Sequence, residues 1–290
     1  METILYTCIP KDVPPCATSC VTSLVGALLL FAAFYSRALE AWRIQGRKLW
    51  LGCLGLAILS AAYNTLYLYG MKSFDIASGA FTFCMTVVVL PVVLLTMHRK
   101  IPLKTWLSVL FVCTGIVLAL GQTLHRGQLP GLGLMGVGCL LRAVFIILLT
   151  DFAKKHDPLA IAIFLELFAS GYSFVGWLCD EPRLFLALPY SRTLVASWTI
   201  YAYFVVAISQ ALNIFGLKRV TAANATIVYS TEIVFTLIWG LILPESLIEH
   251  VKLTPFILLG AILVIVGSLA EIIEFPQKGE KTKEEKEGAV

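Results

Sequence analysis

Apolar segments of roughly twenty residues, the length of one helical bilayer crossing, follow one another between residues 18 and 273, separated by short polar stretches. Hydrophobic residues make up 59% of the chain and charged residues only 14%, whereas about 25% of the residues in a soluble domain are charged. A transmembrane β-barrel would instead show segments of about ten residues with alternating polarity. The sequence therefore predicts an all-α polytopic membrane protein and excludes a soluble globular fold.

Nine transmembrane helices are predicted from the limits of these segments. The first segment is not a signal peptide, because Lys11 and Asp12 precede it instead of a basic region. The segment after Phe275 mixes Lys and Glu and is predicted to be a disordered tail. The predicted spans are Thr18–Tyr35, Trp50–Tyr69, Ile76–Met97, Trp106–Thr123, Leu132–Thr150, Leu159–Leu178, Val195–Leu217, Ala222–Leu243 and Thr254–Ile273.

Basic residues are distributed unequally between the two sets of connecting loops. Short cytoplasmic loops retain Lys and Arg. The loops after the first, third, fifth and seventh spans, together with the C-terminal tail, hold fifteen basic residues, whereas the alternate set holds six. This difference predicts that the N-terminus lies outside the cell and the C-terminus in the cytoplasm.

The chain contains an internal repeat. The segment YLYGMKSFDIASGAFTF (Tyr67–Phe83) aligns with NIFGLKRVTAANATIVY (Asn213–Tyr229) at a fixed offset of 146, which pairs Gly70 with Gly216. In the predicted topology the first copy of this glycine faces outside and the second faces the cytoplasm. This arrangement is typical of inverted-topology repeats in secondary transporters, which expose one midplane site alternately to each side.

Two longer stretches resemble a known family. GLKRVTAANATIVYSTEIVFTLIWGLILPESL, followed by TPFILLGAILVIVGS, is similar to the closing helices of an EamA domain of the drug/metabolite transporter superfamily, and YNTLYLYGMKSFDIASGAFTF is similar to the matching part of a first EamA domain. The resemblance implies two five-helix inverted repeats with both termini in the cytoplasm and a central cavity. It also implies transport of small metabolites, amino acids or amphipathic compounds.

The chain departs from this family at its start. Residues 1–16 are too short and too polar to span a membrane, so we expect the family's ten-helix fold without its first helix. The expected organisation is a first EamA-like repeat of four helices at residues 1–123, a second of five helices at 132–273, and a disordered cytoplasmic tail at 274–290. We expect the protein in the bacterial inner (cell) membrane.

Three ionisable residues lie deep within predicted spans. Charged side chains inside a bilayer cost about 2.5 to 3.5 kcal/mol each on insertion scales, and they usually mark a pathway or an ion pair. Arg142 precedes Thr150 by eight residues and Glu166 follows Pro158 by eight, so at 1.5 Å rise per residue both lie about 12 Å from the cytoplasmic edge. Glu232, ten residues into its span, lies at about 15 Å by the same rise. The three side chains are therefore predicted to share one layer.

Two interpretations of this layer stay open. In the first, Arg142 binds an anionic group of a substrate, while Glu232 or Glu166 binds a coupling proton or a substrate amine. In the second, Arg142 and Glu166 form an ion pair that only ties two helices together. Asn64 and Gln210, which the offset of 146 makes equivalent, either line the cavity or form ordinary interhelical hydrogen bonds. The candidate residues for a cavity that binds substrate and coupling ion are Glu232, Arg142, Glu166, Gln210 and Asn64.

The sequence gives no support for an enzyme. The four histidines lie in predicted loops, and neither HExxH nor CxxC occurs, so we expect no catalytic residues and no metal. Gly131, Gly133 and Gly136 spell GxGxxG, but they open a membrane helix instead of following a strand. No cofactor is therefore expected.

A secondary transporter, acting as an exporter or exchanger by alternating access, is the predicted function. The alternative is a non-transporting membrane scaffold or accessory subunit, or an inactive truncated transporter. The expected partners are a small-molecule substrate and the lipid bilayer, and a homodimer is left open. Nucleic acid is not an expected partner, because the net charge is only +4 and the basic residues lie in membrane-edge loops.

Overall fold

The computed structural model describes residues 9–10, 13–72, 82, 84–98, 101, 103–120, 129–180, 191–242 and 254–272. Within these residues the regular elements are all helical and no strand is present. This confirms the predicted all-α fold class. The predicted tail at 274–290 lies outside the described residues, and the count of nine spans stays a prediction.

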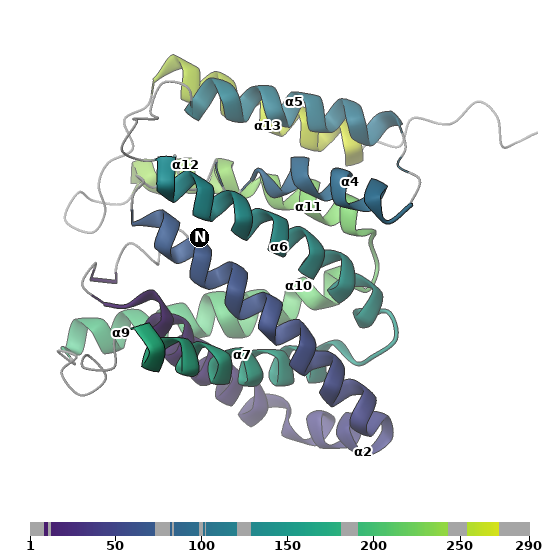
Figure 1. The fold of residues 1–290 in the computed structure, drawn as a ribbon, viewed down its shortest axis with the longest axis vertical. Helices are drawn as coiled ribbons and strands as arrows, with labels where there is room; N and C mark the ends of the chain where they lie inside the picture. The colour runs from purple at the N-terminus through teal and green to yellow at the C-terminus, as the bar shows by residue number, and fades with distance from the viewer. Residues whose placement is uncertain are drawn as a thin grey trace, which may run out of the picture.

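The first two predicted spans lie in one helical element, α2 (Pro15–Met71), of 57 residues. Two of its residues leave the helical conformation: Phe34 (φ −131°, ψ 29°) and Gly46 (φ 49°, ψ −129°). The positive φ at position 46 favours glycine because a Cβ would crowd the backbone there. α2 therefore consists of a first arm (residues 15–33) and a second arm (residues 47–71), joined by a kinked connector (Figure 1).

Several later helices begin at residues that cap their free backbone N–H groups. Asp157 Oδ1 accepts hydrogen bonds from Leu159 N (3.0 Å) and Ala160 N (3.1 Å). The hydroxyl groups of Ser191 and Thr221 cap the helices that begin at Arg192 and Ala222. Such caps fix where each helix starts along the chain. The helices after α2 are α4 (Thr86–Thr96), α5 (Leu103–Leu120), α6 (Leu129–Ala153), α7 (Pro158–Asp180), α9 (Arg192–Tyr201), the π-helix η2 (Ala202–Ser209), α10 (Gln210–Leu217), α11 (Ala222–Ser230), α12 (Glu232–Ile242) and α13 (Pro255–Ile272).

Four of the described helical segments are long and apolar enough to cross a membrane: α2, α6, α7 and the continuous segment Arg192–Leu217, which joins α9, η2 and α10. At 1.5 Å rise per residue, α2 has the length for two crossings, one in each arm. The helices α4, α5 and α13 contain shorter apolar segments. The pair α11 and α12 is interrupted only at Thr231.

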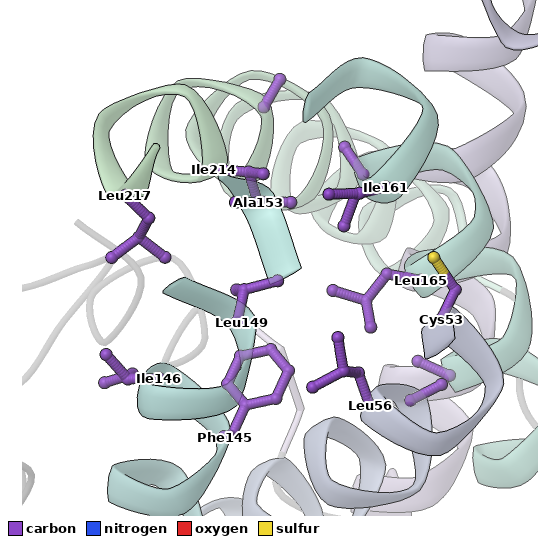
Figure 2. Close-up of a cluster of buried hydrophobic side chains, with 14 of the residues drawn as sticks. Cys53, Leu56, Phe145, Ile146, Leu149, Ala153, Ile161, Leu165, Ile214 and Leu217 are labelled. Atoms are coloured by element: carbon purple, nitrogen blue, oxygen red, sulfur yellow. The ribbon is translucent and has the colours of Figure 1, made fainter. Parts of the chain in front are cut away.

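The buried side chains form two main cores. The larger core is formed mainly by α2, α6, α7 and α10, with further buried residues from α4, η2 and α11. Figure 2 shows Cys53 and Leu56 converging with Phe145, Leu165 and Ile214. The second core joins α4, α5, α11, α12 and α13. In Figure 1 the pair α5 and α13 forms one end of the molecule, and α4, α11 and α12 lie between this pair and the helices α2, α7 and α10. Each core thus takes helices from both halves of the sequence.

α5 and α13 pack backbone against backbone. A Cβ added at Gly115 would lie 2.5 Å from the carbonyl oxygen of Gly260, and one added at Gly260 would lie 2.6 Å from the carbonyl oxygen of Gly115. A Cβ at Gly267 would lie 2.9 Å from the carbonyl oxygen of Ser108. Small residues at such positions let helix backbones approach closely, which is a main source of helix association in membranes.

Candidate functional site

A cavity of about 870 Å³ lies among α2, α6, α7, η2, α10, α11 and α12. The structure places all five residues that were singled out in the sequence on its wall. Asn64 comes from the second arm of α2, Arg142 from α6 and Glu166 from α7, while Gln210 and Glu232 begin α10 and α12.

Glu166 is the most deeply buried charged residue of the described wall, with 4% of its surface exposed. Its Oε2 accepts a hydrogen bond from Ser23 Oγ of the first arm of α2, at 2.7 Å. Its Oε1 accepts one from Gln210 Nε2 of α10, at 3.1 Å. The carboxylate therefore joins three helices, and each of its oxygens has a donor.

The hydrogen bonds continue from Gln210 to α11. Gln210 Oε1 accepts from Asn213 Nδ2 at 3.1 Å, and Asn213 Oδ1 accepts from the hydroxyl of Tyr229. The hydrogen bonds therefore run in one direction, from the Tyr229 hydroxyl through Asn213 and Gln210 to the Glu166 carboxylate. We call Ser23, Glu166, Gln210, Asn213 and Tyr229 the polar network.

Arg142 and Glu232 also lie on the wall of the cavity. The Arg142 Cζ lies 5.7 Å from the centroid of the Tyr229 ring, a position that permits a cation–π interaction. The partners that the structure gives Glu166 are a hydroxyl and an amide. An ion pair between Arg142 and Glu166 stays a prediction.

The π-helix η2 sets the direction of the residues that follow it. π-helical turns are rare and frequently occur at functional sites. Here the turn lies directly before Gln210, and Phe204 and Ser209 of η2 also line the cavity. Gly26 of α2 packs against this turn, and a Cβ at position 26 would lie 2.5 Å from Cγ1 of Val206. A larger residue at position 26 would push η2 away from α2.

Sequence reasoning missed three members of the polar network: Ser23, Asn213 and Tyr229. Hydroxyl and amide side chains are common in membrane helices, so a search for buried charges passes over them. One signal was available for Asn213, which follows Gln210 by three residues and therefore lies on the same helix face. The sequence held no comparable signal for Ser23, because its partner lies 143 residues away.

Comparisons with known proteins agree with the helical architecture. The model of a family described as "EamA-like transporter family" matches residues 2–121 and again residues 122–270. No curated protein matches the chain. A solved structure titled "Crystal structure of protein" superposes with a TM-score of 0.69 at 16% identity, covering 90% of this chain and 88% of that one. At this identity the structural likeness shows a shared fold.

Proposed function

Because the chain belongs to the EamA-like transporter family, we propose that it is a secondary transporter that moves a small metabolite, an amino acid or an amphipathic compound by alternating access. As a member of this family with several apolar helices, it is an integral membrane protein of the drug/metabolite transporter superfamily. The observation that carries the proposal is the cavity, whose wall gathers Arg142, Glu166 and Glu232 from three helices. Ionisable residues at membrane depth are costly and commonly mark transport pathways.

The backbone supports an inverted repeat of two halves, at residues 1–123 and 132–273. Met85 N donates to Thr82 O at 3.0 Å, and Thr231 N donates to Val228 O at 3.1 Å. Both are i→i−3 bonds directly before a helix, α4 in the first half and α12 in the second, and their residues differ by 146, the offset of the sequence repeat. Interrupted helices at related positions of two repeats are common beside transporter binding sites. Thr231 itself lines the cavity.

The proposed function predicts flux through the purified protein. Proteoliposomes loaded with isotope-labelled amino acids and amphipathic amines or acids should release at least one compound faster than protein-free liposomes. The Glu232→Gln variant should fold and change the pH dependence of that release between pH 5 and 8, roughly the window for carboxylate and histidine titration. The glutamine keeps the shape of the side chain and removes its titratable proton.

The matched control is Glu40→Gln, which removes an exposed carboxylate in the connector of α2 and should leave the pH profile unchanged. Release at the protein-free rate for every compound would count against a transporter and favour a scaffold. Identical pH profiles for the wild type and Glu232→Gln would remove Glu232 from the mechanism.

We also propose that the N-terminus lies outside and the C-terminus in the cytoplasm, based on the fifteen-to-six division of basic residues. Two basic connectors lie on one side of the bundle, which supports this orientation, because His156 Nδ1 lies 2.8 Å from Gln45 Oε1. In a cysteine-free background, a single cysteine at Ser73 should react with an impermeant maleimide in intact cells. A cysteine at Gln277 should react only after lysis, and the opposite pattern would reverse the orientation.

A further inference from the structure

We propose that the cavity selects organic cations, compounds that carry one positively charged nitrogen on an apolar body, and that Glu166 binds the charged nitrogen. The proposal rests on the proposed function, because the cavity is the same site. It adds the sign of the ligand's charge and the residue that recognises it.

The charges on the described wall of the cavity do not balance. They are the two carboxylates of Glu166 and Glu232 and the one guanidinium of Arg142. Glu166 lies with two neutral donors, and the described wall carries one more acidic than basic side chain.

Glu166 also keeps the capacity to bind a cation. A carboxylate has about four acceptor positions, and Ser23 and Gln210 use one on each oxygen. These two bonds hold the group in place, and Asn213 in turn holds Gln210. A charged nitrogen in the cavity would meet a carboxylate that is already oriented. In a buried site with low dielectric, such a contact between opposite charges is stronger than it is in water.

The rest of the wall suits an apolar body with positive charge. Aromatic rings of Tyr63, Tyr201, Phe204 and Trp239 line the cavity, and aromatic faces attract organic cations. Its volume of about 870 Å³ lies within the roughly 300–1,000 Å³ of small-molecule sites. A ligand carboxylate in the same space would meet two carboxylates of the protein and only one guanidinium on the described wall.

Three probes with one aromatic body test the sign of the charge: 2-phenylethylammonium, neutral 2-phenylethanol and 3-phenylpropionate. Isothermal titration calorimetry of the purified protein in detergent at pH 7.5 should show the ammonium binding at least about tenfold more tightly than either of the others, a difference of about 1.4 kcal/mol. Tighter or equal binding of 3-phenylpropionate by the wild type would overturn the proposal.

The residue is tested by substitution. Glu166→Gln should weaken binding of 2-phenylethylammonium by about tenfold or more and remove the preference over 2-phenylethanol, whereas the control Glu40→Gln should bind as the wild type does. If Glu166→Gln does not fold, Glu166→Asp keeps the charge on a shorter side chain, and its preference for the ammonium over 3-phenylpropionate should persist with weaker affinity. If Glu166→Gln binds 2-phenylethylammonium with the wild-type affinity, a group other than Glu166 binds the charged nitrogen.

Binding in detergent requires no transport, so the two proposals can fail separately. If the ammonium binds through Glu166 while no compound crosses the proteoliposome membrane, the transporter function fails and the ligand class stands. If only anionic compounds are transported, the transporter function stands and the ligand class is wrong.

Discussion

The Gln210→Leu variant is expected to lose about 1 to 3 kcal/mol of unfolding free energy, the cost of leaving a buried polar group without a partner. The cost arises mainly at Glu166, whose Oε1 accepts from Gln210 at 3.1 Å in a residue only 4% exposed. Asn213, which is part-buried, can find water in the cavity and should add less. Denaturant unfolding in detergent, followed by tryptophan fluorescence, measures the loss.

The neighbouring variant Ser209→Leu is the control, because Ser209 also faces the cavity and is exposed. It should change stability by less than about 0.5 kcal/mol. A double-mutant cycle tests the mechanism further: Glu166→Leu combined with Gln210→Leu should cost less than the sum of the two single losses, by about 0.5 to 3 kcal/mol. Additive losses would show that the hydrogen bond between these residues contributes nothing to stability.

The Gly115→Leu variant is expected to separate α5 from α13 and to lose about 3 kcal/mol or more, at or above the upper end of overpacking effects. The leucine Cβ would lie 2.5 Å from the carbonyl oxygen of Gly260. The obstructing atom belongs to the backbone, so a change of rotamer cannot relieve the clash. The Tm in detergent and the yield of monodisperse protein should both fall.

Gly133→Leu provides the matched control, because a Cβ at this glycine of α6 meets no atom within 4 Å. Leucine has a higher helix propensity than glycine by up to about 1 kcal/mol, so this variant should keep or raise the Tm. Opposite signs for the same substitution would assign the effect to the α5–α13 contact. A Gly115→Leu protein with the wild-type Tm would show that the two helices do not pack this closely.

The helical fold could be predicted because the length of an apolar segment is a one-dimensional property of the sequence. The connector between the first two spans was harder to predict. Its charged residues separate the spans in composition, yet helical hydrogen bonding continues through most of it, and only Phe34 and Gly46 leave the helical conformation. In this connector the backbone conformation does not depend on depth in the membrane. Hydropathy indicates only the depth, so it does not predict that the helix continues.

The candidate site could likewise be predicted only in part. Helical rise gave the depth of Arg142, Glu166 and Glu232, and the structure places all three on one cavity. Depth does not determine which neighbour each side chain faces, because that depends on the rotation of each helix about its axis. The π-helical turn of η2 changes this rotation just before Gln210. No pattern of residues in the sequence predicted this turn. The contact between Gln210 and Glu166 therefore required the structure.

The glycine contact between α5 and α13 also has a consequence for biosynthesis. Gly115 and Gly260 are separated by 145 positions, and at about 5–20 residues per second a ribosome needs roughly 7 to 30 seconds to make the intervening chain. Until α13 is synthesised, the small-residue face of α5 has no α13 to pack against and is exposed to lipid or to other proteins. The last described helix therefore completes the second core. A chain that terminates before α13 would be left with an unpaired α5, a feature that cellular quality control can recognise.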